Sequence, residues 1–235
     1  MRDSLGLPPQ IDACLFDLDG VLTQTAHVHA AAWKRTFDDW LRARAAPFVP
    51  FDATADYARY VDGKLREDGV RAFLASRDIA VSESEVRAIG DRKNARLETL
   101  LRDHPVATYA GSIRYVHAVR DAGLRTAVVS SSKNTQQVLR SAGIADLFDA
   151  RIDGVVAKER HLNGKPAPDT FLAGAEAVGA QPAQAAVFED ALAGVAAGRA
   201  GHFGLVVGVD RVGQAEDLRR NGADVVVDDL SELLR

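Results

Sequence analysis

Two aspartates, Asp17 and Asp19, directly follow an apolar run, Ala13 to Phe16, and Gly20 comes next. The apolar run has the length of a buried strand. Ligands of open α/β sheets bind beyond the carboxyl ends of the strands, so Asp17 stands where a nucleophile or a metal ligand would be useful. Aspartate and glycine also commonly end strands, so this pair alone is equally consistent with a turn or a helix cap.

Three further polar clusters follow strand-like runs or precede helices. The run TAVV ends in the cluster 130–134, SSSKN, and AAVF ends in Glu189 and Asp190. Between them, Lys165 lies on a proline-rich loop before a helix-like stretch. Each cluster alone has a structural explanation as a cap or a surface charge. If the strands are parallel neighbours, however, their carboxyl ends meet, and these groups converge on the two aspartates of the first run.

The residue types of these clusters indicate phosphoryl chemistry. Carboxylates without clustered cysteine or histidine favour a hard cation, most plausibly Mg²⁺. The Ser130 hydroxyl, backbone N–H groups and Lys165 would bind a phosphoryl group. An aspartate that attacks phosphate brings like charges to about 4 Å, which costs about 4 kcal/mol per unit pair at an effective dielectric of about 20. Mg²⁺ and Lys165 would offset this repulsion while Asp17 forms an aspartyl-phosphate and Asp19 transfers protons.

The hydrophobic periodicity divides the chain into two kinds of sequence. Residues from about 27 to 105 predict only helices. One is expected at 26–44 and one at 82–103, and between them lie two short helices broken at Gly63. From residue 110 onward helices and strands alternate, with helices expected at 112–122, 135–142, 168–178 and 192–200 and strands at 125–129, 150–152, 185–188, 203–207 and 224–227. This alternation predicts a doubly wound, mostly parallel α/β sheet. We expect a core of residues 1–26 plus 105–235 and an inserted helical cap of residues 27–104.

The composition is that of an ordinary soluble globular protein. Of the 235 residues, 47% are hydrophobic and 26% are charged, and the net charge is -4. An acidic balance argues against nucleic acid or an anionic membrane as the main partner. The N-terminus has no signal-like apolar core, and the single cysteine, Cys14, lies in the first apolar run. We therefore expect a cytoplasmic protein without an intramolecular disulfide.

The four polar clusters together resemble the motifs of a known family. The segments FDLDG followed by VLTQTAHVHAAAW, VVSSSKN, GKPAPDTF and VFEDALAG resemble, in order and spacing, the motifs of the haloacid dehalogenase superfamily, specifically its β-phosphoglucomutase-like branch. The resemblance covers nearly the whole chain, and the helical insert falls where that branch carries its four-helix cap. It implies a Rossmann-like catalytic core.

The resemblance also implies roles for individual residues. Asp17 resembles the phosphorylated nucleophile and Asp19 the general acid/base. The Mg²⁺ site would consist of Asp17, the Asp19 carbonyl, Glu189 and Asp190. The residues that resemble the holders of the transferring phosphate are Ser130, Ser131 and Lys165. The residues that resemble the family's substrate contacts are His29, Trp33, Gly63, Arg66, Lys93, Ser132, Lys133 and Asn134. Gln24 departs from the family pattern, because many relatives have an aspartate there, and the segment 42–54 is longer than in the smallest relatives.

The reaction implied by the resemblance interconverts β-D-glucose 1-phosphate and glucose 6-phosphate through glucose 1,6-bisphosphate. The alternative is a Mg²⁺-dependent phosphatase of a sugar phosphate or other small phosphate, which would use the same core residues. A non-enzymatic phospho-acceptor domain also clusters Asp, Ser and Lys on such a sheet, but it would not need a helical insert of this length. The partner expected is a small phosphorylated sugar, and the family resemblance favours a monomer.

Overall fold

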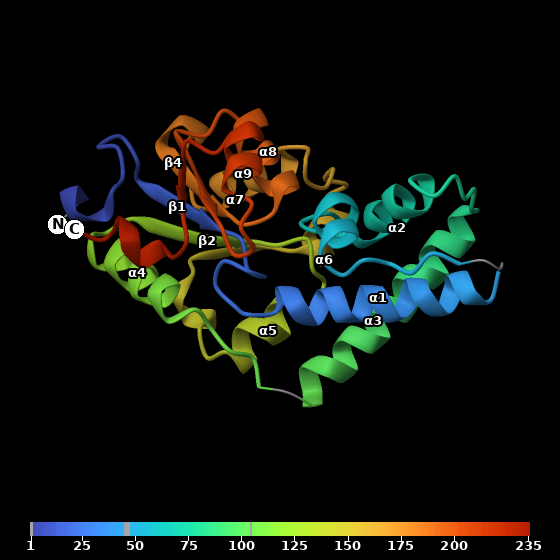
Figure 1. The fold of residues 1–235 in the computed structure, drawn as a ribbon. Helices are drawn as coiled ribbons and strands as arrows, with labels where there is room; N and C mark the ends of the chain where they lie inside the picture. The colour runs from blue at the N-terminus through green and yellow to red at the C-terminus, as the bar shows by residue number, and fades with distance from the viewer. Residues whose placement is uncertain (1, 45–47, 104) are drawn as a thin grey trace.

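The core of the protein is a parallel β-sheet, seen in a computed structural model that describes residues 2–44, 48–103 and 105–235 (Figure 1). Within these residues the sheet has six strands in the order β3-β2-β1-β4-β5-β6. The strands are β1 Ala13–Phe16, β2 Arg125–Val129, β3 Ala150–Ile152, β4 Ala185–Glu189, β5 Leu205–Val209 and β6 Val225–Val227. Neighbouring strands of this sheet all pair in parallel, so their carboxyl ends lie at one edge.

Strand β1 lies in the middle of the sheet and is buried on both faces. Ala13 pairs with Arg125 of β2 on one side and with Ala185 of β4 on the other. Because side chains alternate along a strand, Cys14 faces one hydrophobic layer and Leu15 faces the other. Continuous apolar sequence is what such a doubly covered strand requires.

Helices cover both faces of the sheet, as the doubly wound prediction requires. Aromatic and aliphatic side chains of α4 and α5 belong to one hydrophobic layer, and those of α7, α8 and α9 belong to the other. The helices that follow the strands are α4 Ala110–Asp121, α5 Thr135–Ser141, α6 Gly154–Glu159, α7 Asp169–Ala177, α8 Leu192–Ala200 and α9 Ala215–Arg220. The short 3₁₀ turns are η1 Arg2–Leu5, η3 Ala145–Leu147, η4 Pro182–Gln184 and η5 Leu230–Leu233.

Four elements form a helical segment that extends from the carboxyl edge of the sheet (Figure 1). They are α1 Ala26–Arg42, the π-helical turn η2 Tyr57–Val61, α2 Arg66–Ala75 and α3 Glu83–Asp103. This segment has its own aromatic core, in which Phe37 stacks on Trp33 at 5.0 Å between ring centroids and contacts Phe73 at 4.2 Å. None of the helices in the described ranges is long and apolar enough to cross a membrane.

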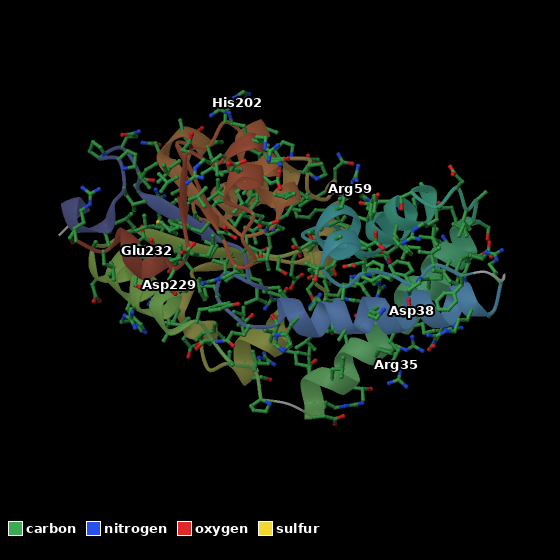
Figure 2. All side chains as sticks on the ribbon, in the orientation of Figure 1. Arg35, Asp38, Arg59, His202, Asp229 and Glu232 are labelled. Carbon is green, nitrogen blue, oxygen red and sulfur yellow. The ribbon has the colours of Figure 1, made fainter. Side chains whose placement is uncertain are left out.

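The described part of the segment 42–54 packs against this aromatic core. Phe51 is fully buried, and its backbone N–H donates to Asp38, a residue labelled in Figure 2, at 2.8 Å. None of residues 48–54 lines the main cavity of the molecule. Residues 45–47 of this segment lie outside the described residues, as does His104 near the end of the expected insert.

The chain passes between the sheet and the helical segment along two adjacent linkers. The backbone N–H of Gln24 donates to Ala107 at 2.8 Å, and that of Tyr109 donates to Leu22 at 3.0 Å. The Gln24 side chain is exposed and donates to the carbonyl of Thr108 at 3.4 Å. The two linkers therefore support each other where they leave the sheet.

Most predicted elements are confirmed, and the differences have physical reasons. The strand expected at 203–207 is found at Leu205–Val209, because Gly204 packs against the carbonyl of Ala183 and pairing with β4 begins at Leu205. Helices α6 and α9 were not predicted, since six residues give too little periodicity. The first short helix before Gly63 is a single π-helical turn.

Candidate active site

Asp17 and Lys165 form a buried ion pair at the carboxyl edge of the sheet. Asp17 comes directly after β1, and Lys165 lies on the loop before α7. The Lys165 Nζ donates to Asp17 Oδ1 at 2.6 Å, to Glu189 Oε1 at 2.7 Å and to the carbonyl of Val129 at 3.1 Å. Burial favours the neutral amine, but the two adjacent carboxylates outweigh it and raise the pKa of Lys165. The side chain is therefore a fixed positive charge beside Asp17.

Opposing effects bring the pKa of the Asp17 carboxyl group close to neutral pH. Burial raises its pKa to about 6, while the charge of Lys165 lowers it. One oxygen is occupied by Lys165, so the second is left for another ligand or for attack on an electrophile. A carboxylate at a strand end, oriented by a buried lysine, is suited to act as a nucleophile.

Asp19 is held by groups from three elements. The Thr25 hydroxyl donates a short hydrogen bond to Asp19 Oδ1, and His29 Nε2 lies 3.5 Å from the same oxygen. The Ser130 hydroxyl lies 3.5 Å from Oδ2. Burial raises the pKa of Asp19, and the hydrogen bond from Thr25 lowers it. A carboxyl group with these neighbours can take up and release a proton while its orientation stays fixed.

Three buried carboxylates are arranged to hold a metal ion. Ligand atoms of Asp17, Glu189 and Asp190 all lie within 4.8 Å of one another. Asp190 Oδ1 is buried and has no hydrogen-bond partner. Both oxygens of Glu189 already accept hydrogen bonds, from Lys165 and from the backbone N–H of Ala191 at 2.7 Å. An oxygen-only donor set with an orphaned carboxylate oxygen fits a hard divalent cation such as Mg²⁺.

The raised pKa values of these carboxyl groups also indicate that too few positive charges surround them. Burial, together with neighbouring carboxylates, raises the pKa of Asp190 and raises that of Glu189 to about 7. The close approach of Gly20 brings the loop after β1 into contact with this cluster. A Cβ atom on Gly20, whose φ is +103°, would lie 1.8 Å from Asp190 Oδ2. Only glycine leaves room for the Asp190 carboxylate there.

The loop after β2 contacts both Asp19 and the helical segment. Ser130 Oγ accepts from the backbone N–H of Ser132 at 3.1 Å. The Ser131 hydroxyl donates to the carbonyl of Gly63 at 2.7 Å, so it faces the helical segment. Asn134 donates to the Asn94 side chain at 3.0 Å. Two hydrogen bonds thus join this loop to the helices above it.

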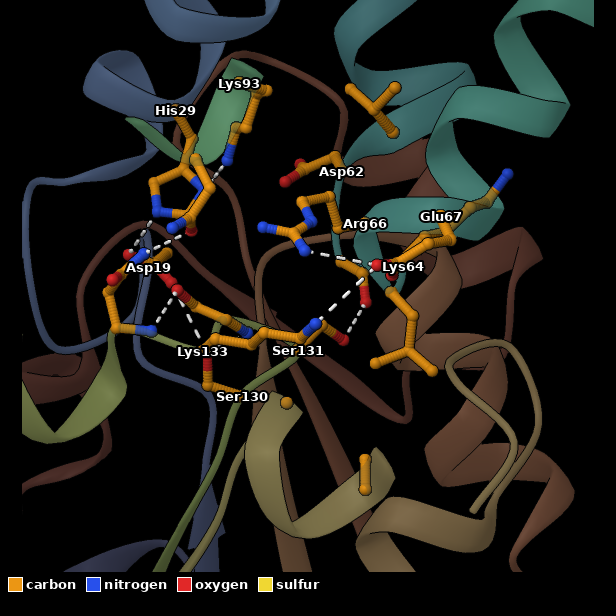
Figure 3. Close-up of a pocket in the computed structure, with 18 of the residues that line it drawn as sticks. Asp19, His29, Asp62, Lys64, Arg66, Glu67, Lys93, Ser130, Ser131 and Lys133 are labelled. Carbon is orange, nitrogen blue, oxygen red and sulfur yellow. Dashed lines mark hydrogen bonds and ion pairs between the residues drawn. The ribbon is translucent and has the colours of Figure 1, made fainter. Parts of the chain in front are cut away.

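The helical segment contributes basic groups that face Asp19 (Figure 3). Lys93 is 5% exposed, and its Nζ lies 3.1 Å from His29 Nδ1 and 5.1 Å from the centroid of the Trp33 ring. Burial lowers the pKa of Lys93 to about 7. Arg66 pairs with Asp91 at 3.0 Å, but its buried Nε has no hydrogen-bond partner.

A cavity of about 510 Å³ lies between the helical segment and the carboxyl edge of the sheet. All of the sequence-predicted site residues line it except Lys165 and Glu189, which are buried beneath Asp17. Tyr57, Asp62 and Asn94 also line the cavity and are not among the residues predicted from the sequence. Asp62 precedes Gly63 and Asn94 follows Lys93, so their positions next to predicted residues are the one signal the sequence offers for these two.

Comparisons with known proteins agree with this geometry. Residues 11–202 match the family model described as haloacid dehalogenase-like hydrolase. A β-phosphoglucomutase of Mycobacterium bovis is 55% identical over 98% of this chain and 94% of its own length. A β-phosphoglucomutase of Bacillus subtilis is 32% identical over 94% of this chain and 91% of its own length. The crystal structure of a β-phosphoglucomutase from Clostridium difficile superposes with a TM-score of 0.79 at 28% identity, covering 95% of this chain and 93% of that chain.

The family match and the geometry support the same conclusion. The matched residues include β1, the loop after it that carries Asp17 and Asp19, Lys165, and the Glu189–Asp190 pair. These residues form the buried cluster described above. The six parallel strands and their covering helices form the α/β architecture expected from the sequence. The chain therefore belongs to the haloacid dehalogenase-like hydrolase family.

Proposed function

We propose that this protein is a β-phosphoglucomutase, which interconverts β-D-glucose 1-phosphate and glucose 6-phosphate through bound glucose 1,6-bisphosphate. The observation that carries the proposal is the near full-length, 55% identity to a mycobacterial protein of that name. The lining of the cavity supports it, because Asp17 lines it from the sheet part and Arg66 and Lys93 line it from the helical segment. A bisphosphate needs such sites at both of its ends.

Asp17 is the proposed nucleophile. Its free oxygen attacks the phosphorus of the bisphosphate, and the bond between phosphorus and the sugar oxygen breaks, which leaves an aspartyl-phosphate and a monophosphate. Lys165 remains beside Asp17 and offsets the repulsion between the carboxylate and the phosphoryl group. The Ser130 hydroxyl and the backbone N–H of Ser131 hold the phosphoryl oxygens.

Asp19 is the proposed general acid and base. It gives its proton to the departing sugar oxygen in the first step. In the second step it takes a proton from the other sugar hydroxyl, whose oxygen then attacks the phosphoryl group on Asp17. The contacts with Thr25 and His29 keep the carboxyl group in the orientation that both transfers require.

The proposed metal is Mg²⁺, held by Asp17, the Asp19 carbonyl, Glu189 and Asp190. When bound, it would neutralise charge on the transferring phosphoryl group. The Glu189 carboxylate also accepts hydrogen bonds from Lys165 and from the backbone N–H of Ala191, which fix its orientation. Asp190 is placed as a direct ligand because one of its oxygens lacks a partner.

We assign the helical segment, residues 27–104, as a cap on a core of residues 1–26 plus 105–235. Arg66, Lys133 and Asn134 would bind the phosphate that does not react, and the other substrate contacts proposed are His29, Trp33, Gly63, Lys93 and Ser132. The hydrogen bonds Ser131 to Gly63 and Asn134 to Asn94 join cap and core, which would exclude water from the aspartyl-phosphate. This exclusion favours mutase activity over hydrolysis.

The chemistry of Cys14 supports a proposal about the cellular setting. Cys14 is fully buried, and burial raises the pKa of its thiol, so it is unreactive as a thiolate. The proposed partner is a small sugar phosphate, and the proposed location is the reducing cytoplasm. The monomer is proposed from the family resemblance.

The decisive experiment is a coupled assay with purified protein, Mg²⁺, β-glucose 1-phosphate and a trace of glucose 1,6-bisphosphate. Glucose 6-phosphate is followed by a dehydrogenase, and free phosphate is followed in parallel. We expect glucose 6-phosphate in large excess over phosphate. Free phosphate without glucose 6-phosphate would refute the mutase and establish a phosphatase.

Two variants complete this assay. Asp17→Asn removes the nucleophile and is expected to abolish turnover of both kinds. Asp146→Asn is the matched control, because Asp146 is exposed and does not line the cavity. Full activity of Asp17→Asn would refute the aspartyl-phosphate route.

A further inference from the structure

The loop Asp210–Gln214 has a defined shape at the same edge of the sheet as the carboxylate cluster. It follows β5, and the sequence analysis assigned it no function. The backbone N–H groups of Val212, Gly213 and Gln214 all donate to Asp210 Oδ1, at 3.1, 2.7 and 2.9 Å. A single carboxylate oxygen therefore fixes the direction of the side chains on this loop.

Arg211 binds the loop that carries the two catalytic aspartates. Its Nε donates to the carbonyl of Gly20 at 2.8 Å, and a terminal nitrogen lies 3.5 Å from the carbonyl of Val21. The other terminal nitrogen donates to the backbone carbonyl of Asp228 at 2.6 Å, and the guanidinium lies 3.6 Å from the centroid of the Tyr109 ring. The side chain is 14% exposed. The planar guanidinium makes several hydrogen bonds at once, so it holds Gly20 in one position.

Gln214 binds the other loop of the proposed metal site. Its Nε2 donates to the backbone carbonyl of Asp190 at 3.0 Å. Asp190 in turn places its carboxylate against Gly20, in the space that a side chain there would fill. Arg211 therefore holds Gly20 and Gln214 holds Asp190, so one loop supports both sides of the contact between Gly20 and Asp190.

We propose that Arg211 and Gln214 are positioning residues for the metal site. Arg211 fixes the peptide that follows the Asp19 carbonyl, and Gln214 fixes the backbone of Asp190. Neither residue belongs to the metal-binding cluster, so their effect is on the placement of its ligands. Groups that orient metal ligands typically contribute about tenfold to a hundredfold in metal affinity. This inference depends on the proposed Mg²⁺ site but not on the identity of the sugar.

The test is a calorimetric titration of metal-free protein with Mg²⁺, without substrate. We expect Gln214→Leu and Arg211→Met to weaken Mg²⁺ binding by about tenfold to a hundredfold. The matched controls are Gln184→Leu and Arg140→Met, since both side chains are exposed and lie outside the cavity lining. Binding constants of Gln214→Leu and Arg211→Met within twofold of wild type would overturn the proposal.

A second set of readouts separates positioning from a general loss of structure. In each variant, the midpoint of thermal unfolding should rise less than in wild type on adding a fixed Mg²⁺ concentration. For Gln214→Leu the midpoint without Mg²⁺ should stay near the wild-type value, whereas Arg211→Met also loses hydrogen bonds to Gly20 and Asp228 and should unfold at a lower temperature. At saturating Mg²⁺ the KM for the sugar phosphate should return to that of wild type. If Arg211→Met does not fold, Gln214→Leu decides the question. Absence of mutase turnover in the wild type would refute the proposed function while leaving the Mg²⁺ comparison intact.

Discussion

Replacing Lys93 by methionine should stabilise the fold and impair the enzyme. The substitution keeps most of the apolar length of the side chain and removes a buried ammonium. Burial lowers the pKa of Lys93 from the 10.5 of an exposed lysine to about 7. The charged and titratable groups that face it are His29, Asp19 and Arg66. The carboxylate of Asp19 favours the ammonium, and the guanidinium of Arg66 disfavours it.

The pKa of Lys93 sets the size and the sign of the effect. At about 1.4 kcal/mol per pH unit, the difference between 10.5 and about 7 gives an upper limit of about 5 kcal/mol for the cost of the buried charge. The folded-state pKa lies below the unfolded value, so this cost is fully present below pH 7 and disappears as the pH rises toward 10.5. The cation–π contact with Trp33 offsets about 1 kcal/mol of it.

The measurement is urea unfolding followed by far-UV circular dichroism at two pH values. We expect Lys93→Met to raise the free energy of unfolding by about 1 to 3 kcal/mol near pH 6.5 and by less than about 1 kcal/mol near pH 9.5. Arg92→Met is the matched control, because Arg92 is exposed on the same helix and should show no such pH-dependent gain. A Lys93→Met protein less stable than wild type at the lower pH would refute the reasoning, as would a gain independent of pH.

The same variant should lose activity, because a charge-assisted hydrogen bond to a phosphorylated substrate contributes about 1.5 to 3 kcal/mol. We therefore expect kcat/KM of Lys93→Met to fall by about tenfold to a hundredfold, with Arg92→Met unaffected. Greater stability together with lower activity would show that the lysine is retained for substrate binding. Unchanged kcat/KM would remove Lys93 from the proposed substrate contacts.

Three other variants test separate parts of the site. Gly20→Ala would place a methyl group 1.8 Å from Asp190 Oδ2 at a residue whose φ is +103°. We therefore expect weaker Mg²⁺ binding by calorimetry and a loss of at least about 1 kcal/mol in the free energy of unfolding. Wild-type values for both would contradict the close approach. Asn94→Ala removes the hydrogen bond to Asn134, so the ratio of free phosphate to glucose 6-phosphate in the coupled assay should rise, and an unchanged ratio would show that this bond does not help to exclude water. Arg66→Met should lower kcat/KM for glucose 1-phosphate by about a hundredfold but leave hydrolysis of a small aryl phosphate nearly unchanged, and equal losses on both substrates would exclude a role at the second phosphate.

The sequence predicted the core of the site because each part of it carries a local signal. Asp17, Lys165 and Asp190 each follow an apolar strand or precede a helix, and parallel strands must bring their carboxyl ends together. Strand β5 was placed two residues early because the apolar run 203–209 is longer than the strand, and only pairing with β4 selects its residues.

Contacts between distant segments carry no such signal. Arg211 binds Gly20 across 191 positions, and nothing near Arg211 in the sequence indicates that partner. Asp62 lines the cavity because the turn before α2 docks on the sheet part, where a Cβ atom on Gly63 would lie 2.9 Å from Ala191. Such docking depends on the whole fold, so periodicity and motif spacing could not have revealed it.

The distribution of charge explains why cap and core should close on a phosphorylated ligand. The core side of the cavity carries carboxyl groups whose pKa values are raised by burial, including Asp17 at about 6 and Asp190. The cap side carries Lys93, whose pKa is lowered by burial, and Arg66, which pairs with Glu67 and Asp91 but whose buried Nε lacks a partner. It also carries Asp62, whose pKa burial raises to about 7. Both sides therefore contain ionisable groups whose charged forms burial disfavours. A phosphate dianion beside Lys93 and Arg66 would stabilise both cations, while a divalent cation would stabilise the carboxylates, so the closed arrangement should bind metal and sugar phosphate more tightly together than either one separately.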